Sequence, residues 1–162
     1  MAIEDLSSPV CGGGVARSAT EGGAASAAIA RSWIGTPYVH QASVKGAGCD
    51  CLGLLRGVWR ELNGKEPELP PPYSPDWAEA TRRETLYAAL ARNLDEIDPQ
   101  HLAPGDVALF RMVRGGPAKH CGIIARAPDG TFTMIHARQR RCVMEEALSA
   151  PWRSKLAFAF RL

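Results

Sequence analysis

The sequence predicts an α+β fold in which N-terminal helices pack on an antiparallel β-sheet. Apolar residues follow a helical period up to about residue 93, and the period changes to two from about residue 106. Helices come first and strands follow, without the strand–helix–strand alternation that a parallel sheet needs. A chain of 162 residues can bury one core unaided, so we expect one domain over residues 23–162.

Residues 1–22 are expected to form a flexible leader, because Gly, Ala and Ser dominate residues 12–28. The chain start has early acidic residues and lacks the apolar segment of a secretory signal. No apolar stretch precedes Cys11, which argues against a lipoprotein anchor. Apolar runs also fall short of the roughly 20 residues that cross a bilayer. We therefore expect synthesis in the cytoplasm and no membrane partner.

Composition argues against nucleic acid as a partner. The net charge is +2, and the 46% hydrophobic and 22% charged fractions are ordinary for a globular protein. The basic cluster RQRR, residues 138–141, is of a kind that usually lies on a solvated surface.

Three helices are expected before the strands. The first covers residues 24–34 and ends at Gly35, and the third covers residues 76–93 after the Pro-rich connector PELPPPYSP. The second begins after Asp50 and ends at Asn63-Gly64, and Gly53 and Gly57 would let another element approach its backbone. The apolar stripe of the second helix contains Leu54, Leu55, Val58, Trp59 and Leu62, and that of the third Trp77, Ala80, Leu86, Tyr87 and Leu90.

Four segments have the strand period, namely residues 106–112, 120–126, 131–137 and 155–162. The middle two flank a Pro-Asp-Gly turn. A three-residue loop over residues 127–129 would pair His120 directly with His136, on one face of the sheet. His40 and His101 lack such a context and are expected to be loop residues.

Cys49 and Cys51 stand one residue apart, directly before the second helix. Structural zinc sites commonly have about two to four residues between paired cysteines, and redox pairs need two residues between the thiols, whereas Cys49 and Cys51 have only Asp50 between them. The other candidate ligands, His120 and Cys121, are strand neighbours that point to opposite faces. We therefore expect no metal, no other cofactor, and a single reactive thiol.

Cys51 is the expected nucleophile, and Cys49 the bystander. With Asp50 as N-cap, Cys51 lies in the first helical turn, where the dipole favours a thiolate by roughly 0.3–1 kcal/mol. The Asp50 carboxylate opposes this effect, so a histidine must take the proton. A paired His120 and His136 could supply a base and the group that orients it.

These residues resemble the NlpC/P60 cysteine peptidases in order and spacing over about residues 26–162. The resemblance rests on the segments GTPYVHQ, GAGCDCLGLLRGVW, LAPGDVALF, HCGII and FTMIHA. Within the family, the chain is most similar to the branch of tail peptidases from phages and gene-transfer agents. It implies a papain-like α+β fold with Cys51 as nucleophile, His120 as general base and acid, and His136 as the third, orienting residue.

The resemblance also implies roles in substrate binding or oxyanion support for Tyr38, Asp50 and Leu52. The Tyr38 hydroxyl would lie beside the nucleophile, and the Cys51 N–H would help hold the oxyanion next to Asp50. Two departures concern the rim of the cleft: Leu52 stands where the family usually has Ser, and HQ stands where glycines are common after the tyrosine.

The resemblance to the NlpC/P60 peptidases implies cleavage of bacterial cell-wall stem peptides, at the γ-D-glutamyl–diaminopimelate bond. We expect delivery on the tail tip of a phage-like particle, with tail hub or baseplate proteins as partners and action in the periplasm or cell wall. Arg111, Arg114, Lys119 and Arg138 are candidates for binding the stem carboxylates. Two alternatives stay open: a structural tail-tip component with little turnover, and an acyltransferase that uses the same thiol.

Overall fold

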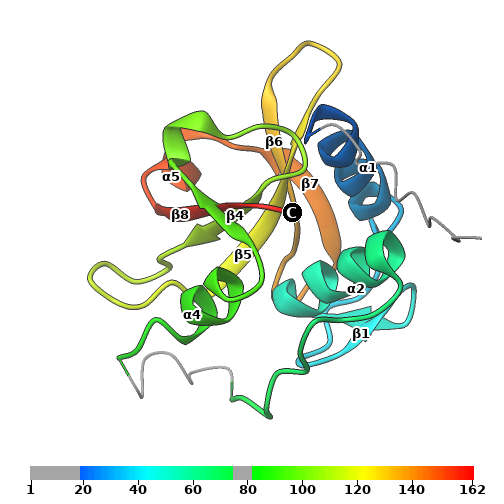
Figure 1. The fold of residues 1–162 in the computed structure, drawn as a ribbon, viewed down its shortest axis with the longest axis vertical. Coiled ribbons are helices and arrows are strands. Elements are labelled where there is room, and N and C mark those ends of the chain that lie inside the picture. The colour runs from blue at the N-terminus through cyan, green and yellow to red at the C-terminus, as the bar shows by residue number, and fades with distance from the viewer. Residues whose placement is uncertain (1–18, 75–81) are drawn as a thin grey trace, which may run out of the picture.

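The computed structural model describes residues 19–74 and 82–162. In the described part, helices α1 and α2 lie against a six-stranded antiparallel sheet of order β3-β8-β4-β5-β6-β7 (Figure 1). The predicted α+β class is thus confirmed. The elements are α1 (Ala19–Arg31), β1 (Ser43–Val44), β2 (Gly48–Cys49), α2 (Cys51–Asn63), α4 (Thr85–Ala91), β3 (Asp95–Ile97), a 3-10 turn (Pro99–His101), β4 (Val107–Phe110), β5 (His120–Arg126), β6 (Phe132–Ala137), β7 (Val143–Ala147), α5 (Ala150–Arg153) and β8 (Leu156–Arg161).

The first helix begins earlier than its sequence predicts. α1 starts at Ala19, so residues 19–22, expected in the flexible leader, are helical. The rest of the expected leader, residues 1–18, lies outside the described residues. Gly35 follows the helical segment with φ 88°, a left-handed conformation that glycine adopts without strain.

Helix α2 has the bounds and caps that the sequence predicts. The Asp50 side chain accepts a hydrogen bond from the Gly53 N–H at its start, and Gly64 ends it with φ 83°. A Cβ at Gly53 would lie 1.9 Å from the Ala42 carbonyl oxygen, and one at Gly57 would lie 2.1 Å from the Trp33 ring. The two glycines therefore allow the close approach that their spacing indicates.

The sheet buries apolar side chains on both faces. One face packs against α1 and α2 through Val107, Leu109, Cys121, Ile123, Ile135 and their neighbours. The other face carries Ala108, Phe110, Ile124 and Met134, and Trp152 of α5 packs against it. Helix α2 and helix α5 therefore lie on opposite sides of the strands that carry the histidines.

The turn between β5 and β6 differs from its expected geometry. Arg126 pairs with Phe132, not with Gly130, because Pro128, Asp129 and Gly130 form the loop and Gly130 supplies its left-handed residue. The register therefore shifts by two residues. His120 and His136 are diagonal neighbours instead of a direct pair, but the even shift leaves both on one face.

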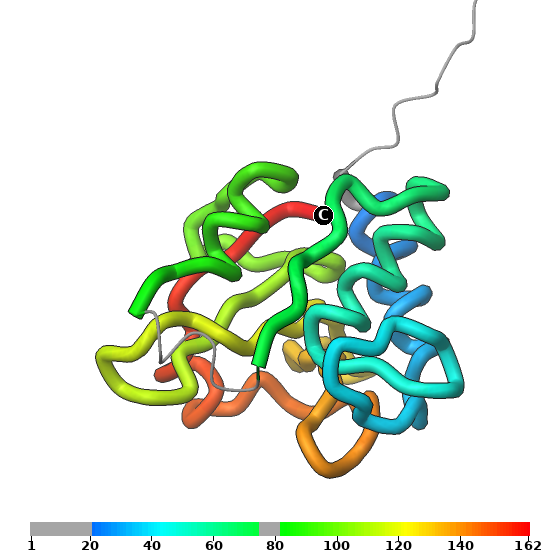
Figure 2. The backbone as a smooth tube through the Cα atoms, turned by 90° about the horizontal axis from the view of Figure 1, so that it is seen from below, coloured from blue at the N-terminus to red at the C-terminus, as the bar shows by residue number. Residues whose placement is uncertain are grey.

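The segment between α2 and β3 also differs from the prediction. The third helix covers only Thr85–Ala91; the expected start at residue 76, with Trp77 and Ala80, lies in residues 75–81, outside the described residues. Leu86 and Leu90 are buried as expected. The preceding residues 64–74 run as an extended segment between α2 and α4 (Figure 2). Within the described residues, no helix is both long and apolar enough to span a membrane.

Candidate active site

A cleft of about 450 Å³ opens where the start of α2 meets the start of β5. Cys51 comes from α2, His120 from β5 and His136 from β6, so three separate elements bring the predicted catalytic residues together. The other residues around the cleft are Tyr38, His40, Asp50, Tyr73, Met112, Val113, Lys119, Ala137, Arg138, Gln139, Trp152 and Lys155.

The two neighbouring thiols, Cys49 and Cys51, have different environments. Cys49 is fully buried, and burial together with the Asp50 charge raises its pKa to about 12. Cys51 is half-buried at the first turn of α2, where backbone N–H groups have no intrahelical partner. Only Cys51 combines access to the cleft with a helix start.

The thiol of Cys51 is acidified by its neighbours. Hydrogen bonding from Cys121 is the largest influence, and the hydrogen bond and charge of His120 act in the same direction, so the pKa of Cys51 lies well below 9.0 despite burial. Cys121 is itself buried, 3.3 Å from the Cys51 carbonyl oxygen, and its pKa is raised well above 9.0. Its one thiol proton can serve either the carbonyl or the Cys51 sulfur.

A chain of hydrogen bonds links His120 to His136 and His136 to Glu146. Nε2 of His120 lies 2.8 Å from Nδ1 of His136, and Nε2 of His136 lies 2.7 Å from Oε1 of Glu146 on β7. His136 is almost fully buried, and burial followed by the proximity of His120 lowers its pKa to about 4. His136 is therefore neutral at physiological pH.

Aromatic side chains hold the His120 ring in place. The Trp152 ring stacks on it at 5.7 Å between centroids, and the Phe110 ring lies 6.2 Å away. Trp152 also meets the His136 ring edge-on at 5.2 Å. Helix α5 thus restricts both imidazoles from the side of the sheet opposite α2.

The carboxylate of Asp50 is buried beside Cys51 and has several donors. It accepts hydrogen bonds from the backbone N–H of Gly53 and of Gln41, each at 2.7 Å, and from the Tyr73 hydroxyl at 2.5 Å. His40 lies 3.6 Å from the same carboxylate. His40, expected as a loop residue without a role, is thus part of the cleft wall.

A family model described as the NlpC/P60 family matches residues 35–161 of this chain. The chain belongs to the NlpC/P60 family. Solved structures agree with the papain-like fold. The NlpC/p60 domain of the peptidoglycan hydrolase SagA superposes with a TM-score of 0.59 and 24% identity, covering 86% of this chain and 98% of that one.

Two further relatives extend the comparison. The peptidoglycan hydrolase RipB of Mycobacterium tuberculosis superposes with a TM-score of 0.57 and 18% identity, over 98% of this chain and 73% of that chain. Gamma-DL-glutamyl hydrolase of Bacillus subtilis (strain 168) is 28% identical over 127 residues, which are 78% of this chain and 26% of that protein. The chain thus spans about a quarter of this curated relative's length.

Tyr38 and Leu52 were predicted to act at the NlpC/P60 cleft, and the structure separates them. Tyr38 lies in the cleft wall, and burial followed by the charges of Cys51 and Asp50 raises its pKa to about 12. Leu52 instead lines an apolar hollow with Leu55, Trp59 and the Pro-rich connector. One step along a helix is about 100°, which turns Leu52 away from the cleft that Cys51 faces.

Basic residues gather at the cleft, though not all of those expected there. Lys119 and Arg138 line it, and Lys155 joins them with its ammonium 5.4 Å from the Trp152 ring centroid. Arg111 donates to Glu84 and to the Gly116 carbonyl oxygen, and it lines a neighbouring hollow with Arg114.

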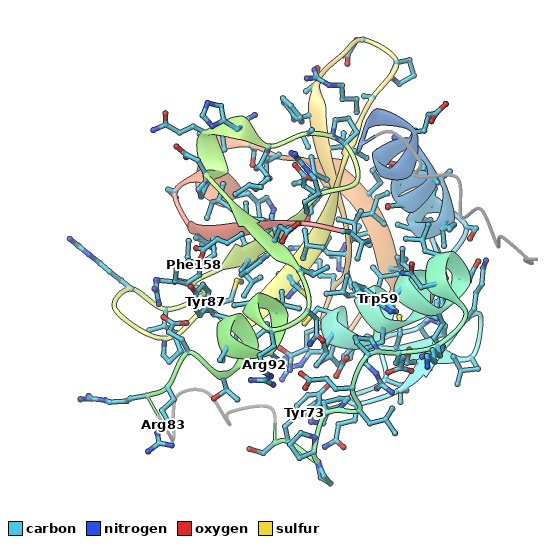
Figure 3. The ribbon with its side chains drawn as sticks, in the orientation of Figure 1. Trp59, Tyr73, Arg83, Tyr87, Arg92 and Phe158 are labelled. Atoms are coloured by element: carbon cyan, nitrogen blue, oxygen red, sulfur yellow. The ribbon has the colours of Figure 1, made fainter. Side chains whose placement is uncertain are left out.

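Three residues of the site were missed by sequence reasoning: Tyr73, Glu146 and Trp152. Tyr73 stands out in Figure 3 on the connector, whose prolines indicated only a spacer. Glu146 lies on β7, a strand that the sequence pattern did not predict. Because that strand was not predicted, no register could place Glu146, which pairs with Met134, two residues before His136. Within residues 19–74 and 82–162, no three His, Cys, Asp or Glu side chains are grouped to hold a metal ion.

Proposed function

We propose that this protein is a cysteine peptidase that hydrolyses the stem peptides of peptidoglycan. The single observation that carries the proposal is the placement of Cys51, with its depressed pKa, beside His120 in an open cleft. Membership of the NlpC/P60 family and the likeness to the peptidoglycan hydrolases SagA and RipB support the substrate class.

The reaction follows from the geometry. His120 takes the thiol proton, and the Cys51 sulfur attacks the peptide carbonyl carbon. The oxyanion forms next to the first backbone N–H groups of α2, which stabilise it. His120 then gives its proton to the leaving amine, and water hydrolyses the thioester to release the acid and restore the thiol.

The bond cleaved is proposed to be γ-D-glutamyl–diaminopimelate. The curated relative is named a gamma-DL-glutamyl hydrolase, which supports a glutamyl residue on the acyl side. Stem peptides carry free carboxylates, and Lys119, Arg138 and Lys155 place positive charge around the cleft. These cations favour an anionic peptide over a neutral one.

The test is to incubate the purified protein with muropeptides and to identify new amines and acids by mass spectrometry. Cys51→Ala should abolish cleavage, whereas Cys49→Ala, a matched change two positions away in the buried core, should leave it. Circular dichroism checks that both variants fold. Equal loss from both variants, or intact muropeptides with the wild-type protein, would contradict the proposal. Products joined to an added amine would indicate acyl transfer instead of hydrolysis.

Delivery by the tail tip of a phage-like particle is proposed from the resemblance of the motif set to tail peptidases of phages and gene-transfer agents. The proposed partners are tail hub or baseplate proteins, and the site of action is the periplasm or cell wall of the target cell. Immunogold labelling of purified particles should place the protein at one end of the tail. Its absence from particles made by cells that express it would contradict this part of the proposal.

A further inference from the structure

The hydrogen-bonded chain of the site does not stop at the third residue. Nε2 of His136 is 2.7 Å from Oε1 of Glu146, and the same carboxylate lies 3.7 Å from the Arg138 guanidinium through its other oxygen. Glu146 is half-buried, with a side chain 27% exposed, whereas the ring that it contacts is 1% exposed. This carboxylate therefore contacts a ring that water hardly reaches.

The contact determines where the ring protons lie. A carboxylate only accepts hydrogen bonds, so Nε2 of His136 must be the protonated nitrogen of this ring. Nδ1 of the neutral His136 ring then has a lone pair, and it accepts from the Nε2–H of His120 at 2.8 Å. When the His120 ring is neutral, its remaining nitrogen, Nδ1, therefore carries no proton and is the one available to the Cys51 thiol.

We infer that Glu146 is a positioning residue that fixes the tautomers of His136 and His120, so that Nδ1 of His120 is free to take the Cys51 proton. Without the carboxylate, His136 can carry its proton on Nδ1 instead. The hydrogen bond between the rings then reverses, and a neutral His120 holds its proton on Nδ1, where it no longer acts as a base. The inference deepens the proposed function and rests on it for the role of Cys51.

The surroundings of His136 leave this task to Glu146. In the part of the chain that the structure describes, the Trp152 indole meets the ring edge-on at 5.2 Å, and Gly122, whose absent side chain leaves room beside the His136 Cβ, lies next to it. Neither offers a side-chain acceptor to Nε2. The low pKa of His136, about 4, keeps the ring neutral, which the chain of donors and acceptors requires.

The decisive experiment measures the tautomers directly by long-range ¹H–¹⁵N NMR of the imidazole rings. It uses the full chain with Cys51→Ala, because a resting thiolate would otherwise leave His120 doubly protonated. We expect His136 and His120 both to be protonated on Nε2 and bare on Nδ1. Adding Glu146→Ala should shift His136 wholly or partly to the Nδ1–H form. His136 protonated on Nδ1 with Glu146 present, or tautomers unmoved by Glu146→Ala, would overturn the inference.

The same tautomer argument predicts the kinetic constants of Glu146 variants that retain Cys51. Loss of the orienting carboxylate of a catalytic triad lowers kcat by about 10⁴-fold. Glu146 acts on His120 only through the His136 ring, so its effect should be smaller. We expect Glu146→Ala to lower kcat on the order of 10- to 100-fold with little change in KM. Glu146→Gln should also lose rate, because its amide N–H can donate to Nε2 of His136 and so stabilise the Nδ1–H tautomer. Unchanged kcat in either Glu146 variant, or equal loss from the control below, would count against a tautomer role.

The matched control is Glu145→Ala, one residue along β7. Glu145 faces the other side of the sheet, where it binds Arg31 and accepts from Thr133 at 2.5 Å. This variant should leave both the tautomers and kcat unchanged. Because the NMR experiment needs no substrate, its failure is distinguishable from failure of the proposed function: correct tautomers without muropeptide cleavage would contradict the function, not the role of Glu146.

Discussion

His136 shows how burial of one ring couples the site to the stability of the fold. Its pKa is about 4 in the folded protein, against 6.5 for an ordinary histidine, and burial is the largest cause. Between these two pH values the unfolded chain binds a proton that the folded chain does not. The free energy of unfolding is therefore unaffected by this ring above pH 6.5 and falls as the pH drops from 6.5 toward 4.

This linkage predicts a pH-dependent stability that one substitution removes. From the two pKa values, His136 should cost about 2 kcal/mol of stability between pH 7.5 and pH 5. Urea unfolding at the two pH values measures the loss. His136→Gln has no titrating group and should show a loss smaller by about that amount, whereas an identical loss in both proteins would show that the ring is not held neutral by the fold.

At the scale of elements, α2 is held by contacts that only glycine permits. Gly57 faces the Trp33 ring, and Trp33, which is 2% exposed, donates a hydrogen bond from Nε1 to Glu61 one turn further along α2 at 2.7 Å. The indole of Trp33 therefore fixes the helix that begins with Cys51. Any side chain at Gly57 must displace this ring.

Substitution of two helical glycines separates this packing effect from helix propensity. Gly57→Ala should lower the free energy of unfolding by about 1–3 kcal/mol, because its Cβ would meet the Trp33 ring. Gly22→Ala in α1 has no atom within 4 Å of its new Cβ and should be neutral or stabilising by up to about 1 kcal/mol. Thermal unfolding compares the two. Similar effects from both variants would contradict the packing argument.

The elements that the sequence predicted well are those whose own residues determine them. The bounds of α2 follow from the Asp50 cap and Gly64, and β5 matches its apolar period. Strand β7 was missed because its VMEEA pattern is half polar: Glu145 and Glu146 both have partners on neighbouring elements, which a local pattern does not contain. The His120–His136 contact was predicted, and the turn register only altered its geometry from direct to diagonal.

At the scale of the whole molecule, the connector and the sheet meet at the start of α2. Residues 64–74 leave the end of α2 and return along it, until the Tyr73 hydroxyl reaches the Asp50 carboxylate next to Cys51. Tyr73 could not be placed from sequence, because its partner lies 23 residues away and its neighbours are prolines. The site is complete only when the connector, α2, β5, β6 and β7 pack together.

The acidity of the Cys51 thiol depends on that assembly, and alkylation across pH tests it most directly. The rate at which iodoacetamide modifies Cys51, located by mass spectrometry from pH 5 to pH 10, reports the thiolate fraction. The wild-type protein should titrate well below pH 9, and His120→Ala should move the midpoint to higher pH, since the charge and hydrogen bond of His120 are lost. A wild-type midpoint near pH 9 that His120→Ala leaves in place would contradict the catalytic pairing of Cys51 with His120.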